Sequence, residues 1–236
     1  SNSFIDVAIN DGDSITALAY YKDKLLQFKR NKVFVINTAG DYESLEDTFH
    51  SIGVVGPAAV VKTPYGIAWV NEYGCFLYDG NQMGNLIDRK MTSDSELANY
   101  GGNYWFVQTG YHSTNQNSYP TIGYVRKSKA LIILKDVNSF LTIAEPEGYE
   151  YSFITKSWTM LYKRTPDSGN SSSAYNGNKT NFVIDRNGDL IWHTNYSTTF
   201  DKIVKWVDNG QNYQDSPGSD LSLIQFRTRD FDFGNP

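Results

Sequence analysis

Apolar residues occupy both faces of a hairpin that the sequence predicts between positions 66 and 80. Two apolar runs, IAWV at 67–70 and CFLY at 75–78, flank the polar connection NEYG at 71–74, whose glycine suits a tight turn. A strand with one face in water alternates apolar and polar residues, and these two runs do not alternate. We therefore expect other sheets to cover both faces of this strand pair.

Strand-like segments recur along the chain in groups of four, with little helical pattern between them. Corresponding positions in the first two groups, Leu25 and Ile67, are 42 residues apart, which is within the repeat length of propeller blades. The predicted strands are 15–21, 24–30, 32–37 and 44–51, then 58–62, 66–71, 75–79 and 84–89, then 121–126, 130–135, 149–155 and 158–163, and finally 181–185, 189–194, 202–208 and 221–229.

This pattern predicts an all-β fold, namely a β-propeller of four-stranded antiparallel blades, with at least four blades visible and four to six in all. In a propeller each small sheet lies between two neighbours, whereas the alternative, a two-sheet sandwich, leaves one face of each strand in water. We expect residues 1–236 to form a single propeller domain, with a terminal strand at 3–9 completing a further blade or closing the ring.

Inserted loops near 90–120 and 165–180 interrupt the strand groups. The first begins with a predicted helix start at 92–97, and both are rich in turn-forming residues. Loops on a rigid scaffold often carry recognition, so the candidate partner contacts are the aromatic residues of the first loop. These residues are Tyr104, Trp105, Tyr111 and Tyr119. The alternative is that they pack the insertion onto the propeller.

Charge and cysteine content exclude several classes of partner. The net charge is −5 and no polybasic tract occurs, so tight binding of nucleic acid by this domain is not expected. No apolar run is long enough to span a bilayer as a helix, and no membrane contact is expected. The single cysteine, Cys75, excludes an intrachain disulfide and is expected to be a small buried residue of an apolar strand.

No motif for catalysis, cofactor binding or metal binding stands out. The three histidines, His50, His112 and His193, lie in unrelated contexts, and no nucleophile or phosphate-binding signature occurs. The segment DRNGD at 185–189 resembles the first half of a calcium loop, but its glycine falls at the fourth place and no glutamate follows at the twelfth. A hairpin turn at Asn-Gly is therefore favoured there. We expect no catalytic, cofactor or metal residues.

Several segments resemble a class of virion proteins of tailed bacteriophages. The resemblance covers most of residues 13–236, is strongest over 13–90 and 121–164, and is absent from the inserted loops. The matching segments are LLQFKRNKVFVI at 25–36, IGVVGP at 52–57, the hairpin ending in Tyr-Asp-Gly at 66–80, and LSLIQFRTRDFDFGNP at 221–236. The class comprises tail-tube, nozzle and packaged-DNA stabilisation proteins of short-tailed phages, including crAss-like phages.

The resemblance implies a non-enzymatic structural and interaction module of a phage tail, in a ring that retains packaged DNA and passes it during ejection. It implies other tail or portal-ring proteins as partners, a homo-oligomeric ring in a longer full-length chain of which this is a fragment, and a place in the virion after synthesis in the host cytoplasm. A glycan-binding propeller for host-surface attachment is one alternative. A carbohydrate-active enzyme is another, and it requires two facing carboxylates about 5–10 Å apart.

Overall fold

The computed structural model describes residues 12–91, 105, 110–112, 116–118, 120–134, 148–161, 182–197 and 200–206. Every regular element in these segments is a β-strand apart from one short 3₁₀ turn, η1 (Pro57–Ala59). The strands form four larger antiparallel sheets and one two-stranded sheet. The prediction of an all-β chain is confirmed.

The four larger sheets are named here by their order along the chain. In each, the strands pair in the order in which they occur in the sequence. Sheet 1 contains β1 (Ile15–Tyr21), β2 (Lys24–Lys29), β3 (Lys32–Asn37) and β4 (Ser44–His50). Sheet 2 contains β5 (Val60–Thr63), β6 (Gly66–Asn71), β7 (Gly74–Tyr78) and β8 (Met83–Asn85).

The second half of the chain follows the same scheme. Sheet 3 contains β11 (Thr121–Val125), β12 (Ala130–Leu134), β13 (Gly148–Ser152) and β14 (Ser157–Leu161). Sheet 4 contains β15 (Val183–Ile184), β16 (Leu190–Ser197) and β17 (Phe200–Lys205). A hairpin of β9 (Gly110–His112) and β10 (Gln116–Ser118), which the sequence pattern did not predict, lies within the first inserted loop.

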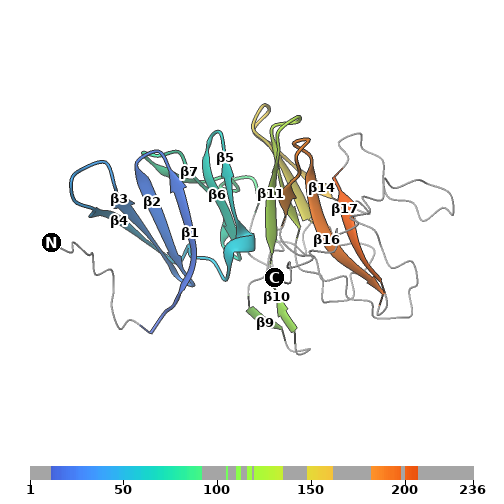
Figure 1. Ribbon diagram of the computed structural model, residues 1–236, viewed down its shortest axis with the longest axis horizontal. Coiled ribbons are helices and arrows are strands. Elements are labelled where there is room, and N and C mark those ends of the chain that lie inside the picture. Colours follow the sequence, from blue (N-terminus) through green and yellow to red (C-terminus); the bar gives the residue numbers. More distant parts are fainter. Residues whose placement is uncertain are drawn as a thin grey trace, which may run out of the picture.

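The four sheets follow one another along the longest axis of the molecule in chain order (Figure 1). The hairpin turns β1–β2, β5–β6, β11–β12, β13–β14 and β15–β16 gather at one end of the sheets, which we call the turn edge (Figure 1). Contacts between the sheets confirm this alignment, since Lys22 Nζ at the β1–β2 turn donates a hydrogen bond of 2.9 Å to the Asp79 carbonyl just after β7.

Sheet 2 is covered on both faces, as its sequence pattern predicts. All six residues of β6 are buried. Trp69 packs edge-on against Phe28 of sheet 1, with ring centroids 5.3 Å apart, and its Nε1 donates a 2.7 Å hydrogen bond to the Ile52 carbonyl. Neighbouring residues in a strand point to opposite faces, so Ala68 and Val70 face the other way and join a core that includes residues of sheet 3.

Cys75 is fully buried in β7, as predicted for a small core residue. Burial raises the pKa of its thiol. Burial also raises the pKa of Tyr151 of sheet 3, and the nearby Cys75 adds to that effect. Cys75 therefore lies on the face of sheet 2 that meets sheet 3.

Sheet 3 also separates two cores. Leu131 and Ile133 of β12 belong to the core shared with sheets 1 and 2. Their neighbours Ile132 and Leu134 belong to a second core with Leu190 and the two tryptophans of sheet 4, Trp192 and Trp206. β12 thus contributes apolar side chains to a core on each face of sheet 3, which explains why apolar and polar residues do not alternate along it.

One predicted strand ends early, and others lie outside the described residues. The strand predicted at 84–89 is only Met83–Asn85, because the Asn85 side chain accepts a 3.2 Å hydrogen bond from the Ile87 amide and the chain turns there. The helix start at 92–97, the loop at 165–180 and the strands at 3–9 and 221–229 fall on residues that are not described.

Candidate functional site

The first strands of the sheets converge, and a cleft opens where they meet. β5 lies close to both β1 and β11, and β11 lies close to β16. The cleft has a volume of about 600 Å³ and takes lining residues from all four sheets. Tyr21 comes from sheet 1, Lys62 from sheet 2, Tyr124 from sheet 3 and Leu190 from sheet 4.

The walls of the cleft are mainly aliphatic. Val60 of β5 and Ile122 of β11 line it together with Ile184 and Leu190 of sheet 4. Gly123 allows sheet 4 to approach this closely, because a Cβ there would lie 2.7 Å from Leu190 Cδ1. Such a wall favours apolar groups of a ligand, because these groups lose contact with water when they bind against it.

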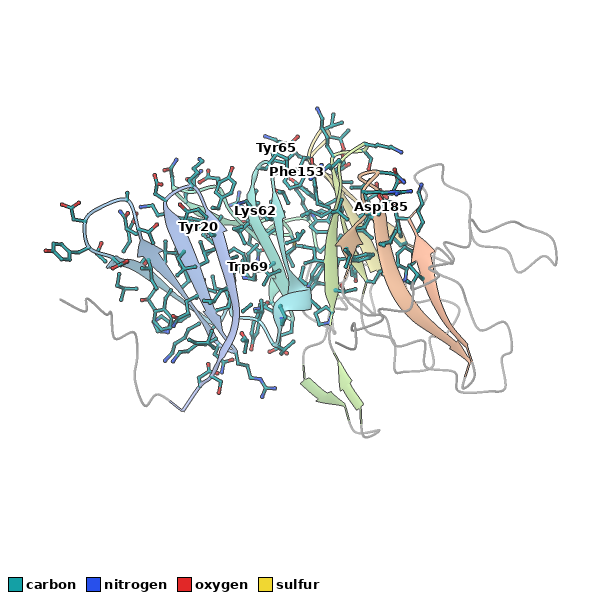
Figure 2. All side chains as sticks on the ribbon, viewed as in Figure 1. Tyr20, Lys62, Tyr65, Trp69, Phe153 and Asp185 are labelled. Carbon is teal, nitrogen blue, oxygen red and sulfur yellow. The ribbon has the colours of Figure 1, made fainter. Side chains whose placement is uncertain are left out.

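Two cations stand at the cleft, one from each of two neighbouring sheets. Lys62 lies on β5 and Arg126 on the β11–β12 turn, and both are exposed. The Lys62 ammonium lies 5.9 Å from the ring centroid of Tyr20 (Figure 2). Neither cation forms an ion pair with a carboxylate in the described part of the chain. Both charges are therefore open to an anionic ligand.

Aromatic rings extend the site along the turn edge. Tyr65 of the β5–β6 turn stacks on Phe153 of the β13–β14 turn, with ring centroids 4.2 Å apart (Figure 2). Tyr124 meets both rings edge-on, at 6.4 Å from Tyr65 and 6.0 Å from Phe153. Burial raises the pKa of Tyr124, so its hydroxyl stays protonated and can donate a hydrogen bond. Tyr65 keeps 38% of its surface exposed and offers a ring to a partner.

Nearby side chains on the turn edge are already engaged. The Asp189 carboxylate accepts from Lys127 Nζ at 3.1 Å and from Lys205 Nζ at 2.5 Å. Lys205 first, and then Lys127, hold the pKa of Asp189 below its ordinary value. Tyr21 donates its hydroxyl to the Pro64 carbonyl at 3.0 Å. Lys127 and Lys205 are therefore already paired with a carboxylate, in contrast to Lys62 and Arg126.

The segment at 185–189 has the hydrogen bonds of a hairpin turn. Asp185 Oδ1 accepts from the backbone amides of Asn187 and Asp189, both at 2.8 Å, and Gly188 has a φ of 81°. These bonds occupy the carboxylate that a calcium loop would use first. Within the described segments, no group of three or more His, Cys, Asp or Glu side chains is placed to hold a metal ion.

Of the four predicted contact residues, the structure describes the side chain of Trp105 alone. Trp105 is 2% exposed, stacks on Tyr149 at 4.7 Å and donates its Nε1 to the Asn71 carbonyl at 2.8 Å. These contacts match the alternative in which the residue packs the insertion onto the sheets. Tyr111 lies in β9, but its side chain is outside the description, as are Tyr104 and Tyr119 altogether.

The sequence reasoning did not single out the residues around the cleft. Lys62 and Tyr65 lie about the β5–β6 turn, while Tyr124 and Arg126 lie about the β11–β12 turn, some 60 positions further on. The usable signal was local: in both places a basic residue and a tyrosine stand close together where a first strand ends. The described residues that line the cleft include no carboxylate, so the site has binding groups and no acid pair.

Comparison with known proteins found no match: no protein-family model and no curated protein matches this chain. Among the described residues, no helix has the length and apolar character needed to cross a membrane.

Proposed function

We propose that this chain is a β-propeller module of a tailed-phage virion, in the nozzle or tail-tube ring, and that it acts by binding neighbouring proteins. In this proposal the four larger sheets are blades. Their supporting features are the sequential strand order, with four strands in sheets 1, 2 and 3 and three described strands in sheet 4, the burial of sheets 2 and 3 on both faces, and the close approach of β5 to β1 and β11 and of β11 to β16. The full-length protein forms a homo-oligomeric ring in the virion after synthesis in the host cytoplasm.

The cleft between the first strands carries the binding part of the proposal. It combines an aliphatic wall with two cations without described carboxylate partners, and the described residues that line it include no acid pair. The exposed ring of Tyr65 lies beside it, in edge contact with Tyr124. These are groups for recognition. The phage part of the proposal rests on the sequence resemblance. Three of the resembling segments form the β2–β3 hairpin, the connection into sheet 2 and the β6–β7 hairpin.

Immunogold electron microscopy of phage particles that encode this sequence tests the proposal. Antibodies raised against the 236-residue chain should label particles at the tail, below the head, and peptides of the chain should be found in purified particles by mass spectrometry. Particles that lack the chain would overturn the proposal. Label on the host surface alone would do the same.

Glycan binding is a second candidate, because Tyr65 presents an exposed ring at the turn edge and aromatic rings stack on sugars. A glycan array with the isolated chain is the test. Saturable binding that disappears in Tyr65→Ala supports a lectin, and binding that persists in Tyr65→Ala contradicts this site. Trp105 is unsuitable for this test, since it is buried and its removal would disturb the packing.

A further inference from the structure

We propose that the cleft binds an extended acidic segment of a partner protein, with an Asp or Glu side chain held by Lys62 and Arg126 and aliphatic neighbours against the wall. The inference rests on the proposed function, since it names the kind of partner that the binding module recognises. It depends on three independent features of the cleft: its wall, its cations and its strand edges.

The wall selects aliphatic side chains. Val60 of sheet 2 and Ile184 of sheet 4 present aliphatic surface to one cleft of about 600 Å³, within the size range of binding pockets, while Ile122 and Leu190 also line it but are almost fully buried. A sugar needs several polar partners around its hydroxyl groups, and this wall supplies few. Valine, leucine or isoleucine side chains of a peptide gain from the same surface, because they leave water on binding.

The cations select a carboxylate. Arg126 presents a planar fork that matches the two oxygens of a carboxylate, and Lys62 adds a point charge from the neighbouring sheet. Lys127 of the β11–β12 turn and Lys205 of β17 differ, because they already bind Asp189. An anionic partner therefore finds two cations without a described ion pair at the cleft, although the whole chain carries a net charge of −5.

The strand edges favour a partner that is an extended peptide, because its backbone can form hydrogen bonds with them. Among the described residues, β5 pairs only with β6 and β11 only with β12, so each of these first strands has one edge without a described strand partner. Such an edge presents backbone donors and acceptors in a row. An extended peptide carries the same groups in the same spacing and satisfies them as it binds.

The test is a fluorescence anisotropy titration of the full 236-residue chain with a labelled synthetic peptide, Ser-Val-Glu-Val-Glu-Val-Ser. The same peptide with Gln for Glu should bind about tenfold more weakly or worse, because a charge-assisted hydrogen bond is lost. Lys62→Gln and Arg126→Gln should each weaken binding of the Glu peptide about tenfold, and added salt should weaken it further.

Arg30→Gln is the matched control, because it removes the same charge from an exposed residue at the β2–β3 turn, away from the turn edge. It should leave the affinity unchanged. Thermal unfolding at an unchanged midpoint would confirm that the variants are folded, as expected for exposed side chains. Equal binding of the Glu and Gln peptides would overturn the inference, and so would equal loss of affinity in Arg30→Gln.

An oligosaccharide of glucuronic acid serves as the competing probe. If it binds in a way that depends on Lys62 and Arg126 while the Glu peptide does not bind, the site takes an acidic glycan and the peptide proposal is wrong. The proposed function is tested separately: a chain found in phage tails that binds no acidic peptide contradicts only the inference, and a chain absent from particles contradicts the proposed function.

Discussion

Sheets 1 and 2 have the same strand order, but β1 of sheet 1 and β6 of sheet 2 differ in how far their residues are buried. In β6 of sheet 2 every residue is buried. In β1 of sheet 1 only Ala17 is buried, while Leu18 is 61% and Tyr20 50% exposed. Sheet 2 has neighbours on both sides, and sheet 1 has one neighbour in the described structure (Figure 1). Burial also depends on the place of a strand in its sheet, since β3 of sheet 1 has four consecutive buried residues, Val33 to Ile36.

Apolar residues in these strands are of two kinds, those buried in a core and those exposed to water. Trp69 in sheet 2 and Leu18 in sheet 1 are both apolar, but only the first lies in a closed core. The free energy of unfolding should depend on the first kind and hardly on the second.

Trp69→Ala should have the largest effect on stability. The indole is fully buried, packs against Phe28 and donates to the Ile52 carbonyl, so its removal leaves a cavity and an unpaired carbonyl. We expect a loss of about 3–5 kcal/mol in the free energy of unfolding, measured by urea titration. Leu18→Ala should cost about 0.5 kcal/mol. Equal losses in the two variants would remove the distinction between the sheets.

Gly66→Ala should have the second largest effect on stability, because sheet 2 has no room for one more carbon atom at this position. A Cβ there would lie 2.1 Å from the Tyr78 carbonyl oxygen, and the φ of 145° is unfavourable for alanine. We expect a loss of roughly 2–3 kcal/mol in urea titration. Gly40→Ala in the β3–β4 connection of sheet 1 is the control, since its nearest atom would be 3.5 Å away. A stable Gly66→Ala protein would argue against the tight packing of sheet 2.

Trp158→Phe should show a smaller effect at the contact between sheets 2 and 3. Trp158 Nε1 donates a 2.9 Å hydrogen bond to the Leu86 carbonyl, and phenylalanine loses it. We expect about 1 kcal/mol by urea titration. Trp192→Phe at the contact between sheets 3 and 4 is the comparison, because its Nε1 has no hydrogen-bond partner among the described residues. A larger loss in Trp192→Phe would reverse this ranking.

Asp189→Asn should have the smallest effect, and it should depend on pH. Lys205 and Lys127 lower the folded-state pKa of Asp189, so the carboxylate stabilises the fold above its unfolded pKa of about 3.9 and loses this effect as pH falls through the folded value. Unfolding by urea at several pH values should show a difference between the wild type and Asp189→Asn near neutrality that shrinks below about pH 4. A constant difference would show that the ion pairs contribute nothing.

Much of the fold could be predicted from the sequence, because strand period and turn residues act locally. The strands 15–21, 32–37 and 66–71 have the predicted bounds. The β9–β10 hairpin was missed because it lies in a segment rich in Gly, Asn and Ser with no apolar alternation. The early end of β8 depends on a side-chain hydrogen bond of Asn85, which no periodicity reports.

The candidate site could not be predicted in the same way. Tyr21, Lys62, Tyr124 and Leu190 meet because β1, β5, β11 and β16 come from four sheets that pack side by side, and that arrangement is set by packing between sheets. Trp105 shows the opposite problem. Its sequence context of Gly, Asn and Tyr is typical of an exposed loop, but Tyr149 and the Asn71 carbonyl hold it in the core.

Sequential strand pairing also has a consequence for the order in which the chain folds. Each strand of the four larger sheets pairs with its neighbour in sequence, so the loops to be closed are short and hairpins can form within microseconds. A new sheet nevertheless keeps one face in water until the next sheet has been synthesised. Cys75 lies opposite Val70, on the face of sheet 2 that points away from sheet 1, so we expect its thiol to lose reactivity when the strands of sheet 3 have formed. Thiol reactivity measured in stalled nascent chains of increasing length would show at which length sheet 3 covers Cys75.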